Sequence, residues 1–350
     1  MVTTLFESIV LNGLINTTAI SVRFSHKFCG KITSVMSISI VIRAFNEQQH
    51  IGRLLHGITQ QTTPDPEVIL VDSGSTDGTL AIAAQYPVKI VHIQPETFTF
   101  GRSLNTGIAA SSGDLVVITS AHCYPLYPDW LEQLTKPFED DAVALCYGKQ
   151  RGGNANHYSE RQFFRKYFPD TSVLQQAHPY SHNANAAIRR SLWEQHPYDE
   201  TLTGLEDLAW SSWVMESGFE IAYVAEAEVI HEHDETYKQV YKRYQREAIA
   251  LKQILPNSTF SLFHFFKLWL GTTLQDLNQA RRERILTQQM DSIIMFRLMQ
   301  YWGTYRGYHF AGKVDAQLHQ AFYYPPHILD DKIPKPRPID PIKYNHDKST

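Results

Sequence analysis

Residues 37 to about 148 alternate short apolar runs with segments of helical periodicity. Such runs are typical of buried strands, and apolar residues three and four positions apart are typical of amphipathic helices. Strands that alternate with helices form βαβ units, which build a parallel sheet. The pattern predicts strands over residues 38–42, 67–72, 88–93, 114–119 and 142–146.

The segments between these strands predict helices. The side chain of Asn46 can cap a helix after the first strand, with Gln49 at the capping-box position. The turn over 74–78 opens the next helix, and further helices are expected over 101–111 and 128–138. The fold class is therefore α/β, with an open, mostly parallel, Rossmann-like sheet and flanking helices. Ligands of such sheets bind beyond the carboxyl ends of the strands.

The second half of the chain is less regular. Residues 149–185 are polar and lack periodicity, which predicts a long loop of the kind that is often functional. A helix is expected over 205–217, and strands over 220–224 and 227–231 follow it. Helical segments then continue to about residue 325, which adds a C-terminal helical region to the fold.

Four stretches are expected along the chain: a poorly ordered extension over 1–36, an α/β domain over 37–235, a helical region over 236–330 and a disordered, proline-rich tail over 331–350. The first stretch lacks the basic start and long apolar run of a signal peptide. Translation from Met1 and translation from Met36 both remain open. No segment reaches the roughly 18 successive apolar residues that a membrane span needs.

Composition narrows the class of protein. Lys and Arg number 32 against 36 Asp and Glu, a net charge of −4, so the chain has no basic footprint for a nucleic acid. The 3 cysteines are sparse and odd in number, which favours a reducing compartment, and we expect a cytoplasmic protein. The motifs GxGxxG after a strand, GxxxxGK[ST], GxSxG and HExxH are absent from the sequence. Their absence argues against dehydrogenases, P-loop NTPases, α/β-hydrolases and zincin proteases.

Candidate binding residues follow the second and third predicted strands. Asp72 and Ser73 end the second strand, where a carboxylate suits hydrogen bonding to a ribose or a base. The alternative is that Asp77 or Ser75 only caps the next helix. Arg102 and Asn105 share one side of a predicted helix. The guanidinium could bind a diphosphate oxygen, and a surface salt bridge is the alternative.

Imidazoles and carboxylates accompany the later elements. His122 comes after the fourth strand, and His231 ends the last one. Both can donate a ring nitrogen to a divalent cation, although histidines at strand ends are also often structural. Glu206 and Asp207 begin the helix over 205–217. Carboxylates there either carry out chemistry or only compensate the helix dipole.

Six segments stand in the order found in one enzyme family. They are Ile40-Val-Ile-Arg-Ala-Phe-Asn-Glu47, Val71-Asp-Ser-Gly-Ser-Thr-Asp-Gly-Thr79, Gly101-Arg-Ser-Leu-Asn-Thr-Gly107, Pro128-Asp-Trp-Leu131, Asn185-Ala-Ala-Ile-Arg-Arg190 and Gly204-Leu-Glu-Asp207. With these segments, residues 37–235 resemble the family 2 glycosyltransferases of the GT-A fold. Tyr147-Gly-Lys-Gln150 and Arg161-Gln-Phe-Phe-Arg165 make the chain look most similar to bacterial rhamnosyltransferase-like members.

The resemblance implies an inverting transfer of a sugar from a nucleotide-diphosphate-sugar donor to a hydroxyl of a cell-surface glycan or lipid-linked acceptor. It gives Asp207 the role of general base, with Glu206 beside it. Such chemistry needs a base for the hydroxyl proton and positive charge for the departing phosphate. The residues that the resemblance places at the donor are Arg43, Ala44, Phe45, Glu47, Asp72, Ser73, Asp77, Arg102, Asn105, Ser120, Ala121, His122 and Asn185.

Two positions depart from the family pattern. The family usually has two aspartates where this chain has Asp72-Ser73, which leaves the nucleotide base open. The metal-binding Asp-x-Asp of the family is here Ser120-Ala121-His122. Polypeptide N-acetylgalactosaminyltransferases use Asp-x-His with a distant histidine, so the resemblance implies that His122 and His231 could hold Mn²⁺ or Mg²⁺. A site without a cation, with Arg102 or loop cations at the leaving group, is the alternative.

Other classes of function remain open. A sugar-nucleotide-binding or glycan-binding protein without catalysis would keep the fold and tolerate the loss of Asp-x-Asp. A nucleotidyltransferase is less favoured, because no glycine-rich phosphate loop with a following lysine is present.

The aromatic residues between 256 and 310 have two interpretations. In the first, a group of them enters the membrane interface at its inner face, beside a lipid-linked acceptor: Phe263, Phe265, Phe266, Trp269 and Leu270. In the second, the segment packs against the catalytic domain, and the seam is filled by Trp302, Tyr305 and Tyr308. The sequence does not predict the sugar, the acceptor or the oligomeric state.

Overall fold

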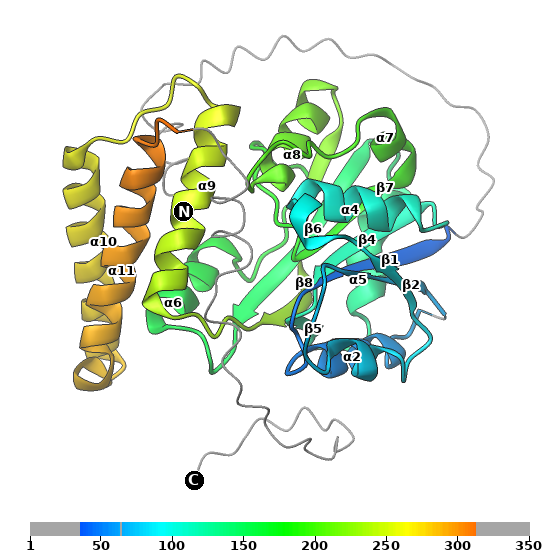
Figure 1. The fold of residues 1–350 in the computed structure, drawn as a ribbon, viewed down its shortest axis with the longest axis horizontal. Coiled ribbons are helices and arrows are strands. Elements are labelled where there is room, and N and C mark those ends of the chain that lie inside the picture. The colour runs from blue at the N-terminus through cyan, green and yellow to red at the C-terminus, as the bar shows by residue number, and fades with distance from the viewer. Residues whose placement is uncertain (1–35, 64, 313–350) are drawn as a thin grey trace.

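The computed structural model describes residues 36–63 and 65–312 (Figure 1). The expected N-terminal extension up to residue 35, the end of the expected helical region and the expected tail lie outside these residues. In the described part, an α/β sheet with flanking helices is followed by three long helices, which stand at the left of Figure 1.

The strands of the described residues form one eight-stranded sheet in the order β3-β2-β1-β4-β7-β6-β8-β5. They are β1 (Ile38–Ala44), β2 (Glu67–Asp72), β3 (Lys89–His92), β4 (Leu115–Ser120), β5 (Cys123–Pro125), β6 (Val143–Gly152), β7 (Asn185–Arg189) and β8 (Glu220–His231). β1 to β4 are parallel, as the βαβ pattern predicts. β7 runs antiparallel to β4 and β6, whereas β8 is parallel to β6 and antiparallel to β5.

Helices cover both faces of the sheet, because the central strands are apolar on both sides. Val41 and Ile118 face one core, whereas their neighbours Ile40 and Val117 face the other. The first face is covered by α4 (Phe100–Ala109), α7 (Arg190–Gln195), α8 (Glu206–Glu216) and α9 (Tyr237–Ile254). The second is covered by α2 (Ile51–Thr59), α3 (Thr79–Ala83) and α5 (Trp130–Thr135), which a 3₁₀ turn over Lys136–Glu139 extends.

The expected cap at the first helix is wrong. α2 begins at Ile51, and its start has no side-chain capping hydrogen bond. Asn46 instead has φ 54°, and its side-chain oxygen accepts a hydrogen bond from the Thr76 amide at 2.8 Å. Gln49 is exposed. Asn46 thus ties the loop after β1 to the loop after β2, a tertiary bond that replaces the local cap.

Residues 149–185 are more regular than the expected loop. β6 continues to Gly152, and α6 spans Tyr158–Tyr167. Both owe their order to partners that are distant in the sequence: β6 pairs with β7 and β8, and α6 packs against α11 (Leu286–Tyr308). The strands expected over 220–224 and 227–231 are one strand, β8, whose register is irregular opposite residues 148–150.

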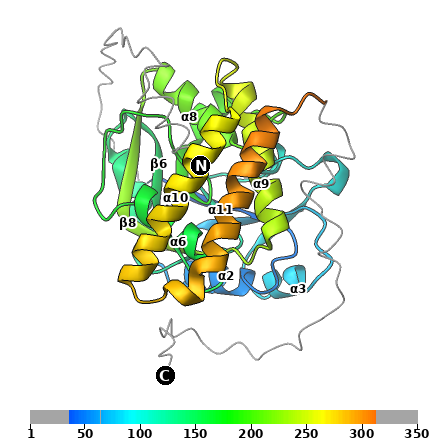
Figure 2. The ribbon, with the colours of Figure 1, turned by 90° about the vertical axis from the view of Figure 1, so that its left-hand side faces the viewer.

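The helices α9, α10 (Leu262–Arg282) and α11 form a layer beside the sheet, and Figure 2 shows α10 and α11 side by side. Capping boxes start α9 at Thr236 and α10 at Ser261. α11 packs closely on α9 at Gly303. A Cβ atom there would lie 2.4 Å from the Tyr241 carbonyl oxygen, so only glycine allows this approach. Among the described residues, no helix has the length and apolar character to cross a membrane.

The aromatic residues of α10 divide between two environments. Phe265 is buried, stacks on Trp269 and meets Trp302 edge-on. Phe263 and Phe266 are 71% and 50% exposed. The inner face of α10 therefore packs against the rest of the protein, as the second interpretation expects. Its outer face is exposed.

Candidate active site

The carboxyl ends of β1, β2 and β4 meet at one edge of the sheet. Ala44 lies beside Asp72 in the parallel ladder, and Arg43 lies beside Ser120. The amide of Ser73 donates a hydrogen bond to the Ala44 carbonyl at 3.1 Å. Predicted donor residues from three distant segments are therefore neighbours at the edge where α/β sheets bind ligands.

The Asp72 carboxylate is buried and is held by its own loop. It accepts hydrogen bonds from the amides of Gly74 and Ser75, each at 3.1 Å, and it lies 3.3 Å from Nδ1 of His92. An aspartate that binds the amides two and three residues ahead fixes the turn that contains them. Asp72 therefore shapes this part of the edge.

Asp77 holds two loops together. Its carboxylate accepts hydrogen bonds from the amide of Thr79, the first residue of α3, at 3.0 Å and from the amide of Gln48 at 3.1 Å. Asp77 was considered either as a donor-binding residue or as a cap of the next helix. Its contacts with backbone amides are of the capping, structural kind. Phe45, in the loop after β1, is partly exposed.

Arg102 and Asn105 are both engaged with the segment before α8. Nε of Arg102 donates to Glu200 at 2.8 Å. In this structure Arg102 therefore forms a salt bridge, the alternative to binding a diphosphate oxygen. The Asn105 side chain accepts from the Tyr198 amide at 3.0 Å and from Nε1 of Trp193 at 2.9 Å. It also donates to the Tyr198 carbonyl at 2.9 Å, so Asn105 fixes this segment against α4.

Asn185, which the resemblance places at the donor, lies in the interior of the sheet. It is fully buried in β7, its side-chain oxygen accepts from Nε1 of Trp130 at 2.9 Å, and its nitrogen donates to the Ala227 carbonyl at 2.8 Å. A buried amide must satisfy its polar atoms within the protein, and here β8 and α5 supply the partners.

A cavity of about 150 Å³ opens where the sheet edge meets α8 and α9. Its walls include Arg43 of β1, His231 of β8, and Glu206 and Asp207 at the start of α8. Leu205, directly before the helix, has φ 59°. This left-handed conformation is unusual for leucine and sets the position of the two acids.

The two consecutive acids have different partners. Glu206 accepts from a guanidinium nitrogen of Arg43 at 3.1 Å and from Nδ2 of Asn183 at 3.4 Å. Asp207 accepts only from backbone amides, those of Leu208 at 2.8 Å and Asn183 at 3.3 Å, and forms no ion pair within the described part of the chain. Glu206 is thus ion-paired with Arg43, whereas Asp207 has no ion pair among the described residues.

The environment of Asp207 favours its protonated form. Burial raises the pKa of Asp207, the neighbouring charge of Glu206 raises it further, and the result is about 7. A carboxyl with a pKa near neutrality can accept a proton at the pH at which it works. The acid that the sequence singles out is therefore suited to act as a general base.

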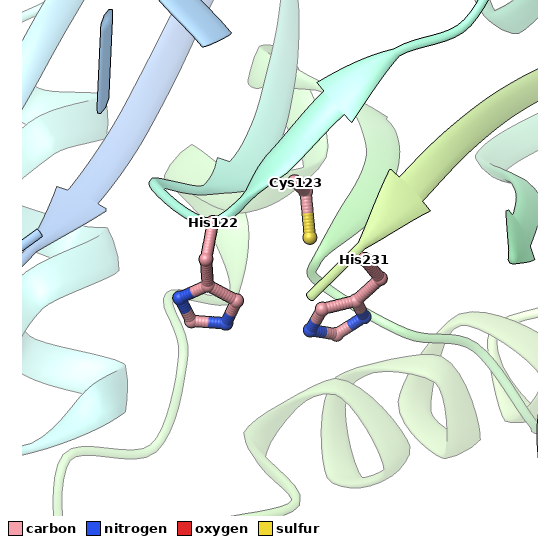
Figure 3. Close-up of side chains that lie close together, drawn as sticks. All are labelled: His122, Cys123 and His231. Carbon is pink, nitrogen blue, oxygen red and sulfur yellow. The ribbon is translucent and has the colours of Figure 1, made fainter. Parts of the chain in front are cut away.

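Three histidines converge beside this cavity. The ring centroids of His122 and His231 are 5.1 Å apart, and the ring of His233 lies 4.2 Å from that of His231 and 5.1 Å from that of His122. Figure 3 shows the sulfur of Cys123 next to the gap between the rings of His122 and His231. The ligand atoms of His122, Cys123 and His231 lie within 4.8 Å of one another, which fits a candidate metal site.

Hydrogen bonds orient the rings. Nδ1 of His122 lies 2.7 Å from the Glu47 carboxylate, Nδ1 of His231 lies 2.6 Å from Oε1 of Gln150, and Nδ1 of His233 lies 2.8 Å from Glu160. An oxygen acceptor at Nδ1 holds the proton there and leaves Nε2 with its lone pair. Such outer partners are typical of metal-binding histidines.

His231 has a buried ring nitrogen that no described residue hydrogen-bonds. The residue is 2% exposed, and its Nε2 has no hydrogen-bond partner among the described residues. Burial and the nearby imidazoles hold the pKa of His231 well below its usual range, so the ring is neutral. A neutral imidazole with a free Nε2 is the form that binds a divalent cation.

Sequence reasoning missed Gln150, Glu160 and His233. Gln150 lies in the Tyr147–Gln150 segment that carried the resemblance, but its role as a partner of His231 needs the pairing of β6 with β8. His233 follows His231 by two residues, a spacing at which extended chain turns side chains to the same face. Glu232 lies between them and contacts Arg53 at 2.9 Å instead.

Known proteins match this chain over the same region. Residues 39–196 match the family described as glycosyl transferase family 2. The O-antigen chain rhamnosyltransferase WbaN of Salmonella anatum is 31% identical over 222 residues, which are 59% of this chain and 70% of that protein. The chain belongs to glycosyl transferase family 2. This glycosyltransferase is also 27% identical over 223 residues to the O-antigen chain rhamnosyltransferase RfbN of Salmonella typhimurium, covering 60% of this chain and 70% of that protein.

The fold agrees with this membership. The mannosyltransferase PcManGT of Pyrobaculum calidifontis, solved with GDP-Man and Mn²⁺, superimposes with a TM-score of 0.53 at 18% identity. The match covers 77% of the glycosyltransferase chain and 88% of the mannosyltransferase. The predicted fold class, GT-A, is confirmed, as is the prediction of a family 2 glycosyltransferase enzyme.

Proposed function

We propose that this glycosyltransferase inverts the anomeric centre as it moves a sugar from a nucleotide-diphosphate donor to a hydroxyl of a glycan or lipid-linked acceptor. The observation that carries the proposal is Asp207: a carboxyl on the wall of a cavity at the sheet edge, without a cation and with a pKa near 7. The two related rhamnosyltransferases support sugar transfer, and the mannosyltransferase solved with GDP-Man supports a sugar-nucleotide donor.

The reaction follows from this geometry. The acceptor hydroxyl attacks the anomeric carbon, the bond from that carbon to the diphosphate oxygen breaks on the opposite face, and Asp207 takes the hydroxyl proton. Proton transfer to or from a positioned side chain typically contributes 10²- to 10⁴-fold to the rate. Arg43 forms an ion pair with Glu206, which reduces the repulsion between the Glu206 carboxylate and the negatively charged donor. Ala44, Phe45, Asp72 and Ser73 are proposed to surround the nucleoside.

We propose that His122 and His231 hold a divalent cation at this site. The unpartnered Nε2 of His231 and the oxygen acceptors at both Nδ1 atoms fit such an ion. When bound, the ion would offset negative charge on the departing diphosphate. The chain's own contribution is to orient both rings through the oxygen acceptors at their Nδ1 atoms and to keep the buried ring of His231 neutral.

The deciding experiment compares Asp207→Asn with Glu216→Gln, an exposed acid at the far end of α8. We expect Asp207→Asn to retain the circular dichroism spectrum and donor binding, and to lower transfer by about 100- to 10,000-fold. Donors are found by thermal stabilisation with UDP-, GDP- and dTDP-sugars, since a ligand of the native state raises its apparent stability. Unchanged turnover in Asp207→Asn rules the proposal out, and donor binding without transfer by the wild type identifies a silent binding protein.

We also propose that α10 contacts the cytoplasmic face of a membrane peripherally. Its outer face exposes Phe263, Phe266 and Leu270, with Lys267 among them, a pattern suited to an anionic lipid surface. Sedimentation with phosphatidylglycerol vesicles tests this. The variant Phe263→Glu/Phe266→Glu should remain in the supernatant, and wild-type protein that does not sediment contradicts the proposal.

A further inference from the structure

A second cavity, of about 560 Å³, lies between α6, α10 and α11. Figure 2 shows α10 and α11 on the side that faces the viewer. Four cationic side chains line it: Arg165, Lys166, Arg282 and Arg297. Asp276 is the one carboxylate among its described lining residues. Positive charge therefore exceeds negative charge on these walls, although the whole chain carries a net charge of −4.

The four cations do not have the same role. Arg297 is buried, and each of its three guanidinium nitrogens donates to a protein group: to Asp276 at 2.8 Å, to Gln300 at 2.8 Å and to the Ser159 carbonyl at 3.2 Å. It fixes α11 to α10 and α6. Arg165 donates to Glu283, outside the cavity lining, through one nitrogen at 2.8 Å. A guanidinium has five N–H donors, so this contact leaves donors for an anion.

The second cavity adjoins the first. Phe163 of α6 lines both cavities, so the cavity with the basic walls and the cavity that contains Asp207 meet at this side chain. A molecule with an anionic group in the second cavity can therefore extend past Phe163 toward the general base.

We propose that the second cavity binds a phosphate or diphosphate group of the acceptor, which directs the reacting hydroxyl to Asp207. Arg165, Lys166 and Arg282 supply the charge-assisted hydrogen bonds, the strongest kind that a phosphate can accept from side chains. This inference rests on the proposed glycosyl transfer and names the chemical class of its acceptor. A water-soluble sugar phosphate and a lipid-linked sugar diphosphate share this chemistry.

Isothermal titration with inorganic pyrophosphate, in EDTA and without donor, tests the basic cavity directly. We expect the wild type to bind, and Lys166→Gln/Arg282→Gln to bind at least tenfold more weakly. Arg281→Gln removes the same charge from the neighbouring position of α10, outside the cavity lining, and should bind as the wild type does. His122→Ala/His231→Ala should also keep the affinity, which separates this site from the donor site. Equal affinity in Lys166→Gln/Arg282→Gln and the wild type overturns the proposal.

Vesicles distinguish the sources of phosphate. If phosphatidic acid vesicles bind and pyrophosphate does not, the basic residues serve a membrane surface and the acceptor subsite is refuted. Binding of pyrophosphate with the expected variant pattern supports it, whether or not vesicles bind. Asp207→Asn should bind pyrophosphate normally, so a failure of this inference is separate from a failure of the general-base assignment.

Discussion

Two parts of the sheet edge use their polar residues differently. Around β2 and α4, Asp72, Asp77 and Asn105 direct their polar atoms to backbone groups of neighbouring loops. Around β4, β8 and α8, Asp207 has no cation and Nε2 of His231 has no partner within the described residues. The first part was expected to bind the donor, and the second was expected to supply the general base and the metal ligands. The difference supports the proposal that the first part builds the shape of the site and the second carries its chemistry.

Among the tests of this comparison, the largest expected effect concerns the orientation of His231. Gln150→Leu removes the acceptor at Nδ1 and frees the ring to turn or to change tautomer. We expect the affinity for Mn²⁺ to fall about 10- to 100-fold, measured by titration calorimetry. Gln195→Leu, on an exposed helix end, is the matched control. A Gln150→Leu protein with wild-type affinity would show that His231 is a structural residue.

Asp72 should affect stability more than chemistry. Asp72→Ala leaves the amides of Gly74 and Ser75 without their acceptor, so we expect the free energy of unfolding to fall by about 1–3 kcal/mol. Urea denaturation measures this loss, with Asp291→Ala, at an exposed position of α11, as the control. If stability is unchanged and donor affinity collapses, the division between the two parts fails.

Asp207 should make stability depend on pH. Its pKa is raised from 3.8 to about 7 in the folded state, so the native protein binds this proton more tightly than the unfolded chain does. The resulting stabilisation is complete below about pH 4 and is lost as the pH rises through about 7. Urea unfolding at several pH values should show this decline in the wild type and a smaller one in Asp207→Asn. Identical pH profiles would contradict the environment described for Asp207.

The smallest effect is expected at Arg102. Its pair with Glu200 is partly exposed, at 43% and 36% of the side chains, and such pairs contribute roughly 0–1 kcal/mol. Arg102→Ala should therefore lower stability by less than about 1 kcal/mol and change the KM for the donor less than threefold. A larger rise in KM would place Arg102 with the chemical part of the edge.

Local patterns were sufficient for the parallel half of the fold. The apolar runs of β1, β2 and β4 predict central strands, because a strand buried on both faces must be apolar throughout. They were insufficient for α6, whose sequence is polar and whose position depends on α11. Asn46 and Gln49 show the same limit: the local capping signal is present, but a bond to the next loop replaces it.

The sequence by itself determined the order of strands and helices and the membership of a glycosyltransferase family. It also singled out Asp207 as the candidate general base. These depend on local periodicity and on motifs that survive in linear order. Only the tertiary structure decided which polar side chains keep an uncommitted atom, since Gln150 reaches His231 across the β6–β8 pairing and Trp130 and Ala227 occupy the amide of Asn185. Whether a polar group is used by the protein or left for a ligand is a property of its neighbours in space, and those neighbours are distant in the chain.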